Sequence, residues 1–331
     1  MNKSLAALAL AAASIVVLTG CSTAAGGAGS GEGGDALSVV ASTNVYGSLA
    51  AQIGGDRVEV TSLIDSAAKD PHSYEATARD RLAVQKADLV IENGGGYDAF
   101  MTELREGSDA TVITAAEYSH DYPDAVVEDD EHADEHDEHE HAEGDHAEDG
   151  HEGHDHIAGF NEHVWFDAHT ISHVVEQIAH DLGELDSAGA ADYEAAAESL
   201  IGELEGIEEE LHTLHDRYGG RTVFITEPLP GLLAEAAGLD DVAPGGFASA
   251  VEEGNDVAPA TMLDALALID GGVDAVLANA QTGGSETERI EQAAKDAGIP
   301  VVTFNELLEA DQSYAEWMRA AISNLTAALG E

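Results

Sequence analysis

Three polar side chains of this sequence lie at predicted junctions between strands and helices, and their chemical types are those that bind transition metals. His72 lies in the loop after the apolar run 58–64, where Pro71 restricts the backbone. His163 lies just before a helical pattern, and Glu227 directly follows a second apolar run. Imidazole nitrogen and carboxylate oxygen are both zinc ligands. Because open α/β sheets bind ligands at their strand ends, these residues are candidate ligands, although a single histidine there is more often a hydrogen-bonded turn residue.

A second group of candidate ligands forms one polar loop. Residues 128–156 contain 15 acidic residues, eight histidines and no Lys or Arg. The loop cannot form a core, so it is either a solvated acidic insertion or a collector of divalent transition metals. Ordering such a loop costs conformational entropy, so we expect weak binding there and a tight site on rigid elements. The auxiliary ligands are His132, His136, His139, His141, His146, His151, His154 and His156.

The overall charge excludes several partners. The 331 residues carry 66 Asp and Glu against 12 Lys and Arg, a formal charge of −54. Nucleic acid binding needs a basic surface that the twelve cations do not supply. Anionic membrane surfaces are disfavoured for the same reason. With 44% hydrophobic residues, the chain can still bury a sizeable core.

The amino end predicts export and anchoring. Residues 1–20 have a Lys near the start and an apolar run of signal-peptide length, too short for a membrane span. The run ends at Cys21 in a pattern that resembles the bacterial lipobox, which predicts lipidation of this cysteine. It is the only cysteine, so intramolecular disulfides and Cys-rich zinc sites are excluded. The small, Gly-rich residues 21–36 suit a flexible tether.

Short β-branched runs alternate with helical patterns along the rest of the chain. This order predicts an α/β fold of two similar lobes, each a mostly parallel sheet flanked by helices. The predicted strands are Leu37–Ser42, Val58–Ile64, Asp88–Glu92, Thr111–Thr114, Thr222–Thr226, Val273–Ala278 and Val301–Phe304. The predicted helices are 45–54, 75–87, 97–106, 231–238, 259–270, 285–297 and 312–329, with an amphipathic helix after Asp167.

One long rigid helix is predicted between the lobes. Residues 189–218 contain no Pro, and a Gly pair follows them. Their apolar residues recur at spacings of 4 and 3, which gives a single buried stripe. We therefore divide the chain into an amino-terminal lobe (37–188), a linking helix (189–219) and a carboxyl-terminal lobe (220–331). The stripe consists of Leu200, Leu204, Ile207, Leu211 and Leu214.

Other conspicuous residues have plainer interpretations. The run Gly94–Gly96 after a strand lacks the Lys and Ser/Thr of a phosphate-binding loop, which favours a tight turn. His169 and His173 are one helical turn apart and could chelate, but an exposed helix face explains them better. His212 and His215 lie on the polar side of the linking helix, which places them in solvent.

Several motifs together resemble the zinc/manganese ABC-transporter solute-binding proteins, solute-binding protein family 9. The motifs are Asp-Pro-His-Ser-Tyr-Glu-Ala-Thr-Ala-Arg-Asp (70–80), Asn-Gly-Gly-Gly-Tyr-Asp (93–98) and Glu-His-Val-Trp-Phe-Asp (162–167). The two lobes and the long linking helix agree with them, so the resemblance extends over 37–331. It implies the cluster A-I type of fold and one metal ion between the lobes. The ligands implied at matching positions are His72, His163 and Glu227.

The fourth ligand departs from the family pattern. The family usually supplies an Asp from the loop after a late strand, whereas residues 278–284 contain no carboxylate. Gln281 could supply a carbonyl oxygen, Asn279 is a further candidate, and water could complete the shell. We slightly favour Gln281.

The resemblance implies an extracytoplasmic, lipid-anchored receptor, monomeric and not an enzyme, that passes a divalent cation to a membrane permease driven by an ATPase. Zinc is the favoured ion because it binds such ligands more tightly than manganese and because the His-rich loop is typical of zinc receptors. Manganese is the alternative, since family members with Glu as the third ligand often bind it.

Two other functions remain open. Two His and a carboxylate could also hold catalytic zinc in a hydrolase, and the chain could be a metal buffer without a transporter.

Overall fold

The computed structural model describes residues 36–66, 71, 74–123, 125, 157, 159–309 and 312–330. Predictions for Cys21, the signal peptide and almost all of the tether lie outside these residues. Among the described residues, no helix combines the length and the apolar character that crossing a membrane requires.

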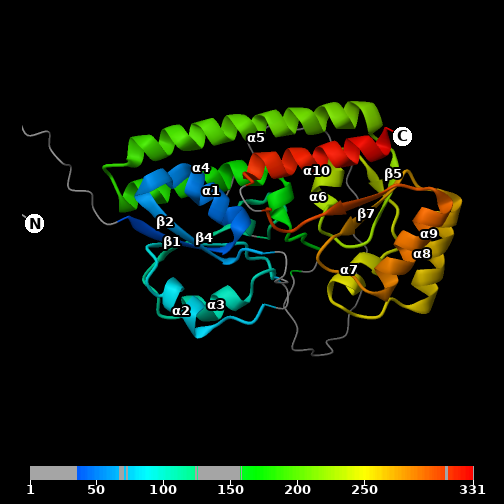
Figure 1. Ribbon diagram of the computed structural model, residues 1–331, viewed down its shortest axis with the longest axis horizontal. Coiled ribbons are helices and arrows are strands. Elements are labelled where there is room, and N and C mark those ends of the chain that lie inside the picture. The colour runs from blue at the N-terminus through cyan, green and yellow to red at the C-terminus, as the bar shows by residue number, and fades with distance from the viewer. Residues whose placement is uncertain are drawn as a thin grey trace, which may run out of the picture. The chain divides into compact units, whose positions relative to one another are not determined.

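The amino-terminal lobe is a parallel sheet with helices around it (Figure 1). Its elements are β1 (Leu37–Thr43), α1 (Asn44–Gly54), η1 (Gly55–Arg57), β2 (Val58–Ile64), α2 (Ala78–Val84), β3 (Leu89–Glu92), α3 (Phe100–Arg105), β4 (Thr111–Thr114), η2 (Ala115–Tyr118), η3 (Val164–Phe166) and α4 (Ala168–Leu185). The strand order is β2-β1-β3-β4, and all pairs are parallel.

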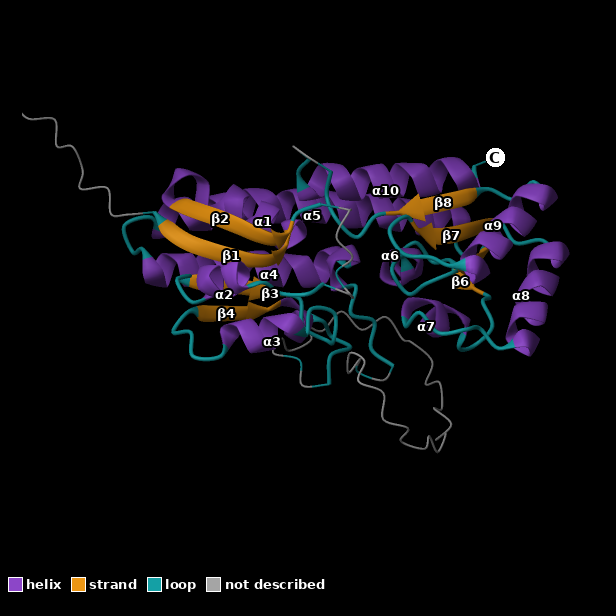
Figure 2. Cartoon of the chain, turned by 60° about the horizontal axis from the view of Figure 1, so that its bottom comes forward, coloured by secondary structure: helices purple, strands orange, loops and turns teal. Residues whose placement is uncertain are grey.

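The carboxyl-terminal lobe repeats this arrangement after the linking helix. Its elements are α5 (Ala190–Tyr218), β5 (Thr222–Ile225), α6 (Gly231–Ala236), β6 (Asp240–Asp241), α7 (Phe247–Glu252), α8 (Pro259–Gly271), β7 (Ala275–Asn279), α9 (Ser285–Ala297), β8 (Val301–Phe304) and α10 (Tyr314–Leu329). The strand order β6-β5-β7-β8 is again fully parallel (Figure 2). The prediction of two parallel-sheet lobes joined by a long helix is confirmed.

A single hydrophobic core joins the two lobes. It contains Val39 and Ile91 from the first sheet, Ile225 and Leu277 from the second, and the stripe of α5 between them. All five predicted stripe residues are buried, with at most 4% exposure. Burial of this shared apolar surface stabilises both lobes together, since apolar area contributes about 25 cal/mol per Å² removed from water.

The last helix of the second lobe also contacts the first lobe. The Tyr314 hydroxyl of α10 donates to the Trp165 carbonyl at 2.7 Å, and the Trp317 and Phe166 rings stack with centroids 4.9 Å apart. A second connection joins the loop after β8 to α1. There the Asn44 amide donates to the Leu308 carbonyl at 2.8 Å and accepts the Leu308 N–H at 3.1 Å. These contacts hold the two lobes together.

Strand β6 and helix α7 were among the elements absent from the sequence prediction. Strand β6 consists of only two residues. Both are aspartate, a residue type that is depleted in strands. It forms because its backbone pairs with the edge of β5. Helix α7 is short and begins after Gly246, whose φ of 78° suits glycine. The Phe247 ring anchors this helix by an edge-on contact with Phe224, with centroids 5.1 Å apart.

Candidate metal centre

His163 lies in the interior between the lobes. It immediately precedes η3 and is 1% exposed. Its ring meets the edges of the Trp165 and Tyr97 rings, with centroids 5.1 and 6.0 Å away. A packed aromatic wall of this kind restricts the imidazole to one orientation.

Asn161 determines which nitrogen of His163 carries the proton. The Asn161 amide nitrogen donates to the Pro228 carbonyl at 3.0 Å, and its Oδ1 accepts the His163 backbone N–H at 3.1 Å. Both partners fix the amide orientation, because a carbonyl only accepts and an N–H only donates. The same Oδ1 lies 2.8 Å from His163 Nδ1, so this nitrogen must carry a hydrogen. In the neutral ring, Nε2 therefore presents its lone pair, as in a metal-binding histidine.

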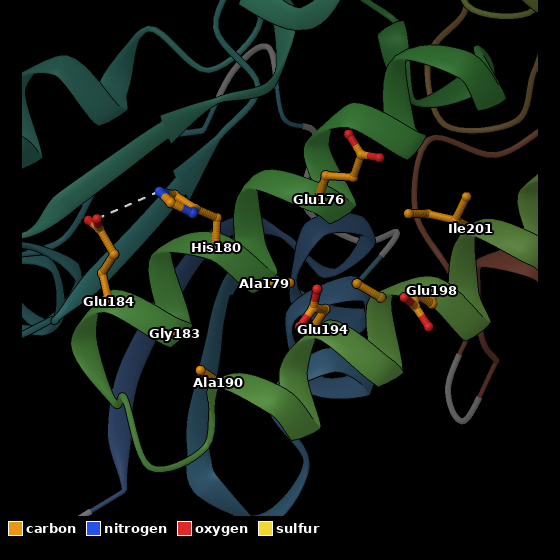
Figure 3. Close-up of a pocket in the computed structure, with 10 residues that line it drawn as sticks. Glu176, Ala179, His180, Gly183, Glu184, Ala190, Glu194, Glu198 and Ile201 are labelled. Atoms are coloured by element: carbon orange, nitrogen blue, oxygen red, sulfur yellow. Dashed lines mark ion pairs between the residues drawn. The ribbon is translucent and has the colours of Figure 1, made fainter.

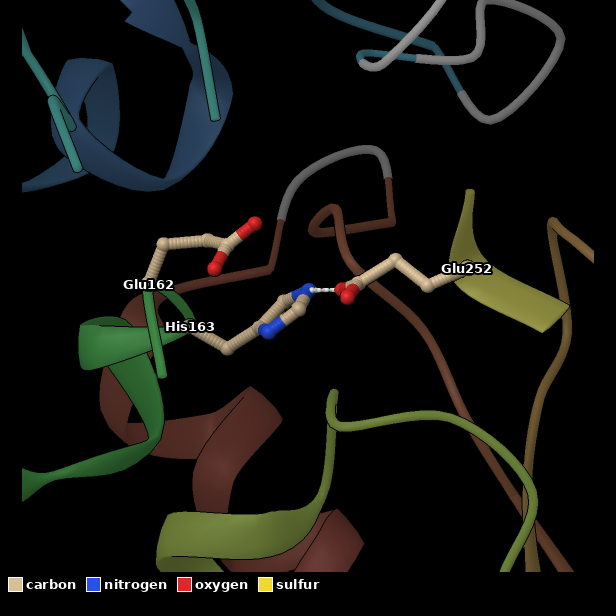
Figure 4. Close-up of side chains that lie close together, drawn as sticks. All are labelled: Glu162, His163 and Glu252. Carbon is tan, nitrogen blue, oxygen red and sulfur yellow. Dashed lines mark ion pairs between the residues drawn. The ribbon is translucent and has the colours of Figure 1, made fainter. Parts of the chain in front are cut away.

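His163 Nε2 faces a carboxylate of the other lobe. Glu252 Oε1, on α7, lies 3.6 Å from it, and the Glu252 side chain is 8% exposed. Glu162 adds a third group, so that Glu162, His163 and Glu252 each bring one ligand atom within 4.8 Å of the others. Figure 4 shows His163 pointing toward Glu252 from the position just before η3. Sequence reasoning did not identify Glu162 or Glu252 as site residues.

Glu227 lies at the carboxyl end of β5, as predicted, and is 3% exposed. The Asn279 amide donates to its Oε2 at 3.0 Å, and the Thr282 hydroxyl donates to the same oxygen. These two donors hold the carboxylate in a fixed orientation. Among the described residues, Glu227 is not part of the group around His163. Its neighbour Pro228 accepts from Asn161, the residue that contacts His163.

Gln281, the favoured fourth ligand, has a different environment from the one expected of a metal-bound amide. Its Oε1 accepts the Glu306 backbone N–H at 2.5 Å, and its own N–H donates to Asn279 Oδ1 at 2.9 Å. These bonds brace the loop after β7 against the loop after β8. Its role as a ligand stays a prediction.

A fully buried carboxylate connects the two lobes beside this loop. Glu306 is 0% exposed, and its Oε2 accepts the Tyr97 hydroxyl of the first lobe at 2.9 Å. Its Oε1 accepts the Asn279 amide at 2.6 Å. Since Asn279 also donates to Glu227, one amide connects the candidate ligand to the bridge between the lobes.

The predicted tight turn after β3 is confirmed, and it supports His163. Asp98 accepts the backbone N–H groups of Asn93 and Gly94 at 2.7 and 2.8 Å, so the turn holds an internal carboxylate where a phosphate loop would hold a ligand. Gly94 has a φ of 77°, and a Cβ there would lie 2.3 Å from Thr114 Cγ2. The Asn93 amide donates to the Glu162 carbonyl at 2.9 Å and so fixes the chain that enters the site.

Glu92, at the end of β3, carries an altered pKa. Burial, with a further contribution from the charge of Asp98, raises its pKa from 4.5 to about 7, although Arg105 Nε lies 3.0 Å away and opposes the shift. The folded state thus holds this proton to higher pH than the unfolded chain. The contribution of this group to the free energy of unfolding is fully present below pH 4.5. It is lost as the pH rises to about 7.

We expect Glu92→Gln to flatten this part of the stability profile. Between pH 4.5 and 7 the wild type should lose on the order of 3 kcal/mol that the variant does not lose, because one pKa unit corresponds to about 1.4 kcal/mol. Urea unfolding at several pH values measures the difference. Glu103→Gln, an exposed change on α3, is the control. Parallel curves for wild type and Glu92→Gln would contradict the assigned pKa.

Several predicted ligands lie outside the described residues. They are His72 and the loop histidines His132, His136, His139, His141, His146, His151, His154 and His156, and the predicted lipidation site Cys21 also lies outside. Their roles stay predictions. The exposed interpretation is confirmed for His169, His212 and His215, while His173 is half-buried.

A second cluster of potential ligands lies on α4. His180 Nε2 and Glu184 Oε1 are 3.7 Å apart, and Asp181 completes the group. His180 and Glu184 border a groove between α4 and α5 whose rim carries several glutamates (Figure 3). His180 and Glu184 are exposed, one turn apart on one helix, so a solvated ion pair accounts for them.

Comparison with known proteins agrees with this architecture. A family model described as "Zinc-uptake complex component A periplasmic" matches residues 39–328. The manganese-binding lipoprotein MntA of Halalkalibacterium halodurans is 28% identical over 233 residues, which cover 69% of this chain and 67% of that protein.

Two solved structures share the fold. The periplasmic zinc-binding protein TroA of Treponema pallidum has a TM-score of 0.68 at 18% identity, covering 89% of this chain and 99% of that one. The solute-binding protein FpvC of Pseudomonas aeruginosa, in complex with Mn²⁺, has a TM-score of 0.65 at 20% identity, covering 89% and 98%. At these identities the likeness concerns the fold alone.

Proposed function

The chain belongs to the family of periplasmic zinc-uptake components and is a receptor for a divalent metal cation, and on this premise we propose that it captures zinc between its lobes. The proposed ligands are His72, His163 and Glu227, with Gln281 as the proposed fourth ligand. The observation that carries the proposal is the 2.8 Å contact between His163 Nδ1 and Asn161 Oδ1. Asn161 places the proton on Nδ1, which leaves a buried Nε2 lone pair directed across the cleft.

Manganese is the second candidate ion. It is favoured by the manganese-binding lipoprotein that is 28% identical to this chain and by the carboxylates around His163. Zinc is favoured by the imidazole ligands, since zinc binds a given set of nitrogen and oxygen donors more tightly than manganese.

One titration series tests both the site and the ion. We expect the wild type to bind one zinc tightly and to release bound manganese when zinc is added. The double variant His72→Ala, His163→Ala should lose this tight site and keep weaker binding by the His-rich loop, as measured by calorimetry. His169→Ala, His173→Ala is the matched control, because it removes two histidines from α4. Tight binding that survives the loss of His72 and His163 would refute the assignment, and preference for manganese would decide the ion.

The rest of the proposed cycle follows from this family role. Cys21 carries the lipid that anchors the receptor to the membrane, and residues 21–36 tether it. The loop 128–156 gathers ions for the receptor, and a permease with its ATPase accepts the ion from a receptor monomer. A receptor needs no bond-making step, so we assign no catalytic residue and do not pursue the hydrolase alternative.

A further inference from the structure

We propose that Glu252, on α7, binds the transported ion directly, opposite His163. This inference rests on the proposed receptor function and changes its ligand set. It places a carboxylate of the second lobe where the sequence analysis slightly favoured the amide of Gln281 over Asn279 or water. Helix α7 then becomes part of the metal centre.

The separation of the two side chains fits two ligands of one ion. Ligand atoms bound at about 2.1 Å to a tetrahedral zinc ion lie about 3.4 Å apart. His163 Nε2 and Glu252 Oε1 are 3.6 Å apart, longer than a good hydrogen bond and close to that value. The two atoms thus flank a position where a cation can bridge them.

Electrostatics leads to the same position. With Nδ1 protonated toward Asn161, a neutral His163 directs its Nε2 lone pair at a carboxylate oxygen. A cation bound between these two atoms is attracted to both, because little water is present in the interior to screen its charge.

Local packing holds Glu252 in place. Phe247, at the start of α7, is fully buried against Phe224, and the backbone N–H of Asn255 closes the end of the helix on the Ala250 carbonyl at 2.8 Å. The next residue, Glu253, is exposed and accepts from the Asn255 amide at 2.7 Å. Two adjacent glutamates thus have opposite environments, and only Glu252 is directed at His163.

Gln281 is the weaker candidate for this position. Its Oε1 already accepts the Glu306 N–H, so metal binding would compete with a bond that braces two loops. An amide oxygen is also neutral, whereas Glu252 brings a full negative charge to the cation. The structure therefore favours Glu252 over Gln281 as the carboxyl-terminal lobe's added ligand.

The test compares Glu252→Gln with Glu253→Gln, which makes the same change one residue away on the exposed side. We expect Glu252→Gln to raise the Kd for zinc at least about 100-fold, the upper end of what loss of a supporting residue causes. Glu253→Gln should stay within about twofold. The cobalt-loaded Glu252→Gln protein should also show altered d–d absorption bands, because one ligand has changed. Near-ultraviolet circular dichroism of the metal-free variants checks that both fold.

Each other outcome has a distinct meaning. Wild-type affinity and cobalt bands in Glu252→Gln would overturn the inference. Weakened affinity with unchanged cobalt bands would also overturn it, since Glu252 would then only position His163. If the wild type itself bound no ion, the receptor function would fail instead. Glu252→Asp, which keeps the charge on a shorter side chain, should recover part of the affinity.

Discussion

Glu306→Ala is expected to lower the free energy of unfolding by about 3–5 kcal/mol, because two buried donors lose their acceptor and each unsatisfied group costs about 1–3 kcal/mol. Those donors are the Tyr97 hydroxyl and the Asn279 amide. Burial, and then the nearby Glu306 carboxylate, raises the pKa of Tyr97 well above its ordinary value, so the phenol keeps the proton it donates. Equilibrium unfolding in urea of the metal-free protein measures the loss.

The matched control for this change is Glu309→Ala. Glu309 is exposed, three residues further along the same loop, and its removal should change stability by less than about 0.5 kcal/mol. The loss of stability in Glu306→Gln should fall between the two. Its amide oxygen can still accept from one donor, but its NH₂ group then faces the other donor. If Glu306→Ala were as stable as Glu309→Ala, the bridge between the lobes would contribute nothing to stability.

Asn161→Ala is expected to weaken zinc binding by about 10–100-fold, the range found when a residue that orients a metal ligand is lost. The side chain does two things at once. It holds the Nδ1 proton of His163, and it ties the first lobe to Pro228, beside Glu227. Both candidate ligands therefore lose orientation. Calorimetric titration with zinc measures the affinity.

Nitrogen-15 spectra of the His163 ring separate this role from a general loss of structure. In the metal-free wild type at neutral or higher pH, we expect the Nδ1-protonated form. In Asn161→Ala, the two tautomers should mix. Asn324→Ala, on the exposed face of α10, is the control and should leave both the affinity and the spectrum unchanged. A wild-type tautomer in Asn161→Ala would show that the proton position has another cause.

The sequence predicted the fold well because the alternation of strands and helices is explicit. The strands over 58–64, 111–114 and 301–304 begin and end as predicted, since apolar runs bounded by loops define them. Helix α5 differs by one residue at its start. What the pattern could not supply was β6, whose two aspartates pair only because β5 offers an edge.

The site was predictable where strand ends position it and unpredictable where tertiary packing does. Glu227 follows a strand, and His163 lies in a distinctive motif, so both were identified. Glu252 lies in an acidic pair in which nothing local distinguishes one glutamate from the next. The available signal was the Gly246-Phe247 start of a short helix, which predicts an anchored segment without indicating what Glu252 faces. Asn161 was quoted within a motif, but its role depends on Pro228, 67 residues away.

The way α10 lies on the first lobe constrains the order in which the protein can be assembled. The residues made last, including Tyr314 and Trp317, cover Trp165 and Phe166, which belong to the half made first. Leu325 and Leu329 join the same core as Val39 near the other end of the chain. The amino-terminal half therefore cannot complete its interior while the chain is still emerging. Folding is a whole-chain event, and truncating α10 removes part of the interior of a lobe that it follows by more than 120 residues.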